Sequence, residues 1–320
     1  MDFKNDVEAL DGLQAKFKEL KTEITRVIYG QDEVITQVLV TLFSRGHVLL
    51  IGVPGLAKTL LVTSIAKILG LKYNRIQFTP DLMPSDIIGT EILDKERQFK
   101  FIQGPLFANI ILADEINRTP PKTQSALLEA MQERAITAAG QRFELEKPFF
   151  VLATQNPIEQ EGTYPLPEAQ LDRFMFSVWL DYPKFDDEIT IVKNTTSNLN
   201  VDLKTVISGA EIKYFQELIR KVPINDNVLK YAVNLAAKTR PGNNLSADIS
   251  NQYLKWGAGP RASQYLVLGA KTHAAVHGKY SPDIEDVKAV APSILRHRII
   301  KNYKAEAENI SVEDIISKLL

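Results

Sequence analysis

The sequence predicts an α/β fold, in which a parallel five-stranded sheet forms a first domain and a smaller, all-helical domain follows. Two observations predict it. Short apolar segments alternate with helix-like stretches as far as Leu180, which is the pattern of a parallel sheet with crossover helices. After Tyr182-Pro183 the helix-like stretches continue with few strand signals. We therefore expect the domains to span residues 1–182 and 183–320.

Each predicted strand is a short apolar segment that is too brief for a buried helix. The five are His47–Ile51, Tyr73–Phe78, Asn109–Ala113, Phe149–Ala153 and Phe174–Leu180. Apolar residues at helical spacing predict the helices, which are Val7–Ile28, Gln31–Phe43, Lys58–Leu69 and Pro120–Glu133, and then Asp186–Thr195, Ala210–Lys221, Asp226–Thr239, Pro260–His277 and Ile284–Arg296. A hairpin is predicted at Ala135–Glu144, with its turn at Ala139-Gly140.

The composition is that of an ordinary globular protein, with 320 residues of which 45% are hydrophobic and 24% charged. The net charge of −1 argues against a strongly basic nucleic-acid-binding protein. Without cysteine the chain has no disulfide and no thiolate metal site. No apolar stretch approaches the roughly 20 residues of a membrane span, and the polar start does not resemble a signal peptide. We expect a cytoplasmic protein.

A phosphate-binding loop is predicted where Gly52-Val53-Pro54-Gly55-Leu56-Ala57-Lys58-Thr59 follows an apolar strand and opens a helix. Small residues let backbone N–H groups converge on phosphates at the positive end of that helix. We expect Lys58 to reach the outer phosphates and Thr59 to coordinate Mg²⁺. The residues expected to contact ATP here are Val53, Pro54, Gly55, Leu56, Ala57, Lys58, Thr59 and Leu60.

This loop departs from the usual motif in one position. Ala57 stands where the last glycine is usual, so its methyl group must tolerate a close backbone approach. The alternative interpretation of the segment is a strand–turn–helix corner with a surface lysine.

A second motif consists of two carboxylates at the end of an apolar strand, Ile110–Ala113 followed by Asp114 and Glu115. This is the pattern of a Walker B motif at the carboxyl edge of a parallel sheet. Asp114 is expected to hold Mg²⁺ through its hydration shell, and Glu115 to polarise the water that attacks the γ-phosphate. A helix start that merely carries acidic residues is the alternative, but the helix begins only after Thr119-Pro120.

Asn156 follows the next predicted strand and is expected at the same sheet edge as Lys58 and Asp114. A neutral amide there can orient the attacking water and sense the γ-phosphate. Because Asn156 precedes a proline, the alternative is an ordinary turn residue.

The chain resembles the MoxR family of AAA+ ATPases, in the clade that carries an insertion near the second helix and is related to the magnesium chelatase ATPase subunit. The resemblance covers most of Ile28–Pro183 and returns around Gly257–Ala262. Its longest matching stretches are Gly104–Leu106 leading into Leu112–Arg118, the helix Pro120–Glu133, and Thr154–Phe174. A lone Walker motif would be far less specific.

The resemblance implies an AAA+ P-loop core with a helical lid, and roles for several residues. Asn156 looks like sensor 1, Arg173 like the arginine finger and Arg261 like the sensor 2 arginine. The segment containing Val27, Ile28, Gly30 and Gln31 looks like the adenine side of the site, although a helix–helix joint is also compatible with it. Asp86–Phe101 matches the inserted hairpin, whose Phe99 and Phe101 either face partners or belong to a half-buried strand.

The implied function is Mg²⁺-dependent ATP hydrolysis by a homo-oligomer, expected as a hexameric ring, that remodels or activates partner complexes. The implied partners include proteins with a von Willebrand factor A domain. One alternative is a nucleotide-gated scaffold with little turnover, against which Glu115 argues because a pure binding site needs no water-activating carboxylate. The other is a DNA-acting motor, against which the neutral charge argues.

Overall fold

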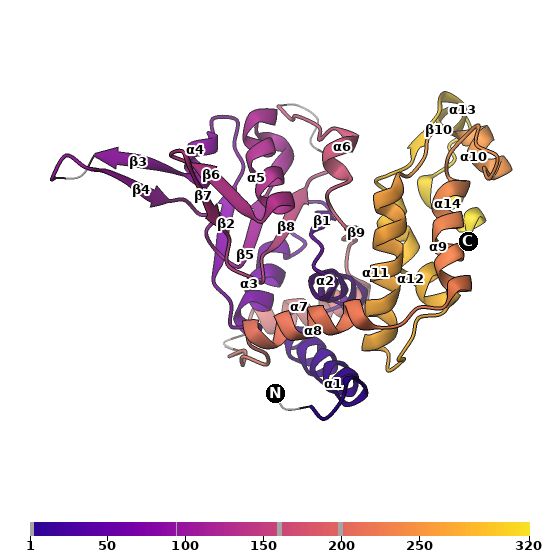
Figure 1. Cartoon of the computed structure of the whole chain (residues 1–320), viewed down its shortest axis with the longest axis horizontal. Helices are drawn as coiled ribbons and strands as arrows, with labels where there is room; N and C mark the ends of the chain where they lie inside the picture. Colours follow the sequence, from indigo (N-terminus) through magenta and orange to yellow (C-terminus); the bar gives the residue numbers. More distant parts are fainter. Residues whose placement is uncertain (1–2, 94, 159–161, 198–200) are drawn as a thin grey trace. The chain divides into compact units, whose positions relative to one another are not determined.

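The computed structural model describes residues 3–93, 95–158, 162–197 and 201–320 (Figure 1). Residues 159–161, which belong to one matched family stretch, lie outside these ranges. By its internal contacts the chain divides into two compact units. The sheet unit comprises Lys18–Pro167 and Val178–Lys213, and the helical unit comprises Met1–Phe17, Glu168–Ser177 and Tyr214–Leu320. The consecutive domains 1–182 and 183–320 stay a prediction.

The predicted five-stranded parallel sheet is confirmed, in the order β2-β5-β8-β1-β9. Its strands are β1 Val48–Ile51, β2 Tyr73–Gln77, β5 Ile110–Asp114, β8 Phe150–Gln155 and β9 Phe176–Trp179. The parallel registers place Leu112 of β5 beside Leu152 of β8, and Val48 of β1 also beside Leu152. Since β8 lies between β5 and β1, the segments that follow these three strands emerge side by side at one edge.

Helices connect and cover these strands. In chain order they are the last part of α1 Asp6–Thr25, whose residues as far as Phe17 belong to the helical unit, and then α2 Asp32–Phe43, α3 Lys58–Ile68, α4 Pro84–Ile88, the 3₁₀ turn Ile116–Arg118, α5 Pro121–Glu133 and α7 Phe185–Thr195. The apolar side of α3 includes Leu61, Ile65 and Ile68, which recur at helical spacing and are fully buried. This burial holds the start of α3 at the end of β1.

Two hairpins extend from the sheet unit, β3 Gly89–Leu93 with β4 Phe99–Gln103, and β6 Ala135–Ala138 with β7 Gln141–Glu144. The second matches the prediction for Ala135–Glu144. In the first, Phe101 stacks on Phe143 with ring centroids 4.8 Å apart, whereas Phe99 is 76% exposed. Phe101 therefore fits the half-buried strand of the second alternative, and a partner contact at Phe99 stays a prediction. Figure 1 shows the β3–β4 arm reaching away from the sheet.

The helical unit contains α6 Glu168–Leu171, most of α8 Gly209–Lys221, and then α9 Asp226–Lys238, α10 Asp248–Tyr253, α11 Pro260–Val276, α12 Ile284–Leu295, α13 Tyr303–Ala307 and α14 Val312–Leu319. The expectation of an all-helical second domain needs one correction. Leu254–Trp256 (β10) pairs antiparallel with Ile300–Lys301 (β11). Strands this short show no alternating apolar pattern, so the sequence does not reveal them.

Candidate active site

The loop between β1 and α3 curls through two left-handed residues. Gly55 has φ +87° and Ala57 has φ +54°, ψ +25°, and α3 begins at Lys58 directly after them. A Cβ atom at Gly55 would meet nothing within 4 Å, so the space beside the loop is open. The loop is anchored by Leu56, which is 7% exposed, while Pro54, Ala57, Thr59 and Leu60 are exposed. The geometry is that of a cradle for an anionic group at a helix N-terminus.

Lys58 turns back across this loop. Its Nζ donates to the carbonyl oxygen of Gly52 at 2.8 Å, which spans the loop from end to end. Ala57, which stands where the motif usually has its last glycine, adopts the left-handed conformation that favours glycine.

The segment expected on the adenine side lies against the same loop. Gln31 Nε2 donates to the carbonyl of Leu56 at 3.3 Å, and Ile28 is buried with 3% exposure. Gly30 has φ +70°, and a Cβ there would come within 2.7 Å of Asp187 Oδ2, so glycine fits this turn. The loop and this segment, far apart in sequence, therefore meet within the sheet unit.

A cavity of about 320 Å³ lies beside this segment, next to the first turn of α3 and the end of α7. Its lining includes Val27 and Leu60, which were expected at the site, and it also includes Arg26, Tyr29, Asn194, Thr195, Ser197 and Val201. The contribution from the end of α7 was missed, because exposed polar residues on a helix carry no signal that distinguishes them from an ordinary solvated face.

The two carboxylates at the end of β5 are held by different partners. Asp114 Oδ1 accepts from the Thr154 hydroxyl at 2.6 Å, and its Oδ2 accepts from Arg75 Nη2 at 2.7 Å. Glu115 Oε2 accepts from Gln77 Nε2 at 2.8 Å and lies 3.3 Å from Arg118 Nε. The two acids therefore sit in separate environments, as separate roles require.

Thr154 joins this pair to the neighbouring strand. Its hydroxyl donates to Asp114 and accepts from the backbone N–H of Glu115 at 2.8 Å, and the residue is fully buried. Glu115 itself is left-handed, with φ +58°. Sequence reasoning missed Thr154, Arg75 and Gln77. Arg75 and Gln77 alternate along β2, and a search for period-two polar residues on the strand beside the acidic pair could have found them.

Asn156 follows β8, between the ends of β5 and β1, and is 4% exposed. Its Oδ1 accepts from the backbone N–H of Ile158 at 3.2 Å, which is the turn role named above as the alternative. Asn156 therefore lies at the sheet edge, as its sensor role requires, and also makes the hydrogen bond of a turn residue.

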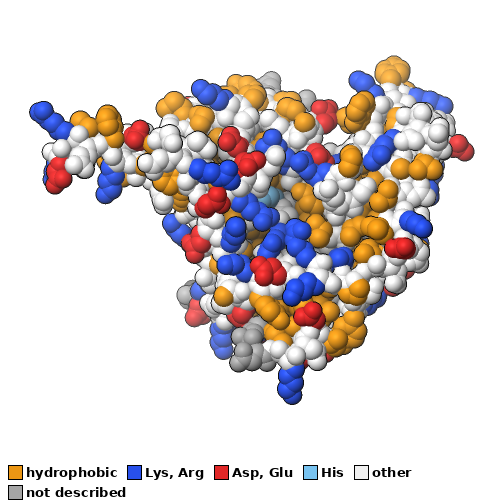
Figure 2. Space-filling model, viewed as in Figure 1, with side chains coloured by type: hydrophobic (Ala, Val, Ile, Leu, Met, Phe, Trp, Pro, Cys, Tyr) orange, Lys and Arg blue, Asp and Glu red, His pale blue; other side chains and the backbone are white. Residues whose placement is uncertain are grey.

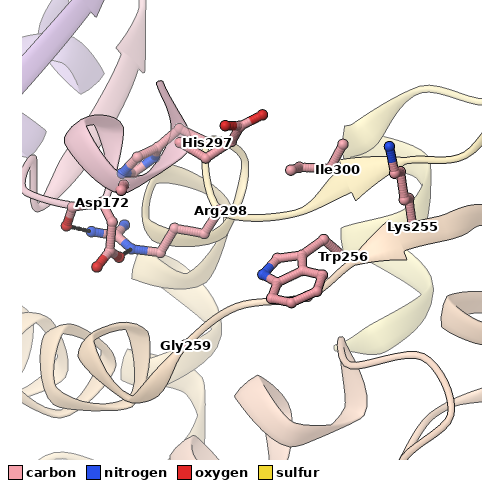
Figure 3. A pocket seen from close by; sticks show the side chains of 10 residues that line it. Asp172, Lys255, Trp256, Gly259, His297, Arg298 and Ile300 are labelled. Atoms are coloured by element: carbon pink, nitrogen blue, oxygen red, sulfur yellow. Dashed lines mark hydrogen bonds and ion pairs between the residues drawn. The ribbon is translucent and has the colours of Figure 1, made fainter. Parts of the chain in front are cut away.

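The two arginines expected at the site belong to the helical unit. Arg261 Nη1 lies 3.0 Å from Asp172 Oδ2, and Arg173 directly follows Asp172. Asp172 Oδ1 also accepts from Arg298 Nε at 2.7 Å. Figure 3 shows Arg298 and Asp172 joined to each other beside Trp256. All three residues line a cavity of about 520 Å³. Arg298 was not anticipated, since nothing local in its sequence marks it.

Comparisons with known proteins identify the family and the fold of the chain. Residues 47–176 match the model of the ATPase family associated with various cellular activities (AAA), and residues 246–319 match the AAA lid domain. The chain is 43% identical to Chaperone MoxR1 of Mycobacterium tuberculosis, over 97% of this chain and 83% of that protein. It is 40% identical to the uncharacterized protein YeaC of Bacillus subtilis, over 93% and 91%.

Among solved structures, one from Cytophaga hutchinsonii, to which an ATPase activity has been provisionally assigned, superposes with a TM-score of 0.91. It is 44% identical, and the match covers 98% of this chain and 95% of that one. Within the described ranges, no helix is both long and apolar enough to cross a membrane. High identity over nearly the whole length, together with both matched models, shows that the chain belongs to the MoxR family of AAA+ ATPases.

Proposed function

We propose that this protein hydrolyses ATP with Mg²⁺, as a ring-forming, chaperone-like ATPase that remodels or activates partner complexes. One observation carries the proposal. The curled loop before α3 and the acidic pair Asp114 and Glu115 emerge from β1 and β5 at one sheet edge, with β8 and its Thr154 between them. Phosphate binding and water activation need such groups side by side.

The residues present fit a nucleotide with its metal. The loop is open at Gly55, where a side chain would intrude on a phosphate, and Gln31 Oε1 is buried with no hydrogen-bond partner among the described residues. Thr59 and Asp114 supply the oxygen atoms that Mg²⁺ prefers, and the ion when bound would neutralise phosphate charge. Lys58 would leave the Gly52 carbonyl to meet the outer phosphates. Glu115 would accept a proton from the attacking water.

The three remaining residues are assigned roles by family resemblance. Asn156 is proposed as sensor 1, because it follows the strand between the other two motifs. Arg173 is proposed as an arginine finger that serves the site of a neighbouring subunit, and Arg261 as the sensor 2 arginine. A guanidinium that meets the γ-phosphate in the transition state can contribute about 10³–10⁵ in rate. A homo-hexameric ring would give every site one such neighbour.

The proposed biological role rests on the similar proteins and is therefore less specific than the proposed chemistry. One similar protein is named as a chaperone. We propose a related activity on client complexes in the cytoplasm, with von Willebrand factor A domain proteins as partners.

Steady-state phosphate release, with ATP and with or without Mg²⁺, tests the proposal. The wild type should turn over only with the metal, and Glu115→Gln should bind ATP without turnover, because the amide keeps the shape but is a poor base. Wild-type turnover in that variant would remove Glu115 from the mechanism. ATP binding without any turnover in the wild type would favour the scaffold alternative.

A further inference from the structure

Arg298 is a buried cation that the proposed function has not used. It lies three residues beyond the end of α12, and its side chain is 2% exposed. Burial lowers the pKa of its guanidinium, while the charge of Asp172 opposes that effect. A buried arginine is costly unless its donors are satisfied, so the identity of its acceptors indicates what it is for.

Most of the acceptors are backbone carbonyls on either side of Arg173, and one more is the carbonyl of Ile294 in the last turn of α12, to which Nη1 also donates. Arg298 Nη2 donates to the carbonyls of Asp172, at 2.9 Å, and of Phe174, and Nη1 donates to that of Met175 at 3.2 Å. Its Nε donates to the Asp172 carboxylate, as Figure 3 shows. One guanidinium therefore fixes the backbone on both sides of Arg173.

Tyr265 completes this arrangement from α11. Its hydroxyl donates to the remaining carbonyl, that of Arg173, at 3.4 Å, and its ring lies 5.1 Å from the Arg298 guanidinium carbon. These two side chains, which we call the Arg298–Tyr265 clamp, thus engage the carbonyls of all residues from 172 to 175, and His297 Nε2 also lies 3.0 Å from the Phe174 carbonyl oxygen. The planar five-donor fork of arginine can serve several carbonyls at once, and the single ammonium of lysine cannot hold the same set in one plane.

We propose that Arg298 is a positioning residue for the arginine finger. The inference rests on the proposed function of Arg173. Arg298 does not touch ATP in this role. It holds the backbone from which Arg173 extends, so that the finger side chain starts from a fixed base when it meets a neighbour's γ-phosphate. A catalytic group that is misplaced by about 1 Å can cost about 100-fold in rate.

The first test replaces the fork but keeps the charge. Arg298→Lys should lower kcat by about 10- to 100-fold and change the KM for ATP by less than about twofold, because the finger acts mainly in the transition state. The matched control is Arg296→Lys, two residues away, whose guanidinium donates to the Ser177 carbonyl and pairs with Glu313. It should keep near wild-type kcat. Equal losses in the two variants, or none in Arg298→Lys, would overturn the inference.

The second test asks which site Arg298 serves, by mixing variants of low activity into shared rings. A ring of Arg298→Lys and Glu115→Gln subunits should regain activity, because some interfaces join an intact Glu115 to an intact finger. A ring of Arg298→Lys and Arg173→Ala should not, because both lack a working finger. If Arg298 served only its own subunit's site, the two results would be exchanged, and the inference would be wrong.

The mixture of Arg173→Ala with Glu115→Gln is the reference. If this reference mixture is active, the shared site is supported. Should Arg298→Lys then regain activity with Arg173→Ala and not with Glu115→Gln, only the clamp would be overturned. If this mixture stays inactive in rings that demonstrably contain both subunits, the proposed shared site fails and the clamp falls with it. Arg298→Gln is a second variant for the same mixtures if Arg298→Lys does not yield folded rings, which melting curves will show.

Discussion

The sheet edge and the region around Asp172 place charged side chains by different means. At the edge, Lys58 and the acidic pair follow directly from strand ends and helix starts, so backbone geometry sets their positions. Around Asp172, long side chains from distant parts of the chain hold the charged groups in place. Arg261 is 89 residues from Asp172 in the sequence, and Arg298 is 126 residues from it. The comparison teaches that substitutions at the edge should act through the chemistry of one residue, whereas substitutions around Asp172 should also act through geometry.

The largest effect is expected at the edge. Lys58→Ala should abolish tight ATP binding, because the loop's N–H groups cannot replace the full positive charge with which the lysine binds the outer phosphates. ATP should then no longer raise the melting temperature, as it should for Glu115→Gln. Lys67→Ala is the control, since Lys67 lies on the same helix but pairs with the exposed Asp202. Unchanged ATP affinity in Lys58→Ala would refute the placement of the phosphates.

Arg173→Ala probes the other region. It should lower kcat by about 10³ and leave ATP binding nearly intact, because a finger from a neighbouring subunit acts in the transition state. Phosphate release and nucleotide titration on the same preparation separate the two quantities. If ATP affinity fell by as much as kcat, Arg173 would contact ATP already in the ground state. The two regions would then differ less than proposed.

Acid should weaken the sheet unit through His47, which ties the start of β1 to its surroundings. Its Nδ1 accepts from Val151 N at 3.0 Å, its Nε2 faces the Met131 carbonyl at 3.1 Å, and burial lowers its pKa to about 4. Between pH 6.5 and about 4 the unfolded chain binds a proton that the folded chain does not, so stability falls as pH falls through this window. The expected loss is about 3 kcal/mol.

Urea unfolding at several pH values measures this loss. The variant His47→Gln should show a correspondingly weaker pH dependence, although it is less stable at neutral pH. His273 and His297, whose pKa values are also lowered by burial, should leave a residual dependence in both proteins. Identical pH dependence in variant and wild type would exclude His47 as a source.

Thr154→Val tests whether the edge depends on the hydroxyl between its two acids. Removing it leaves the Glu115 N–H and one Asp114 oxygen without this partner, which should cost about 1–3 kcal/mol of unfolding free energy. Hydrolysis should fall by about tenfold with binding retained, because Glu115 loses its fixed backbone. Thr154→Ser keeps the hydroxyl and should behave almost as wild type. Wild-type behaviour of Thr154→Val, with a loss in Thr154→Ser, would show that packing and not the hydroxyl matters there.

The smallest effect is expected at Ala57. Glycine removes the strain of a left-handed alanine but also raises the conformational entropy of the unfolded chain. Ala57→Gly should therefore raise the free energy of unfolding by only about 0.5 kcal/mol. Thermal unfolding without nucleotide measures it. A clear destabilisation would mean that the methyl group makes packing contacts that outweigh its strain.

Most of the fold was predictable, because apolar period and turn residues are local signals. All five strands and the Ala135–Glu144 hairpin were found to within a few residues. The β10–β11 pair was missed because two or three residues cannot show a period. The positions of Lys58, Asp114 and Glu115 follow from strand ends, and their roles stay predictions. Arg298 could not be found, since its meaning depends on carbonyls more than a hundred residues earlier in the chain.

The distance between Arg298 and the carbonyls it holds also sets an order of events during synthesis. A ribosome adding about 5–20 residues per second exposes residues 172–175 roughly 6–25 s before Arg298 follows, because 126 positions separate Asp172 from it. During that interval the emerging chain already carries the complete sheet edge but has no clamp. A nascent or prematurely terminated chain therefore carries the loop and the acidic pair proposed to bind ATP before it carries the clamp proposed to position an arginine.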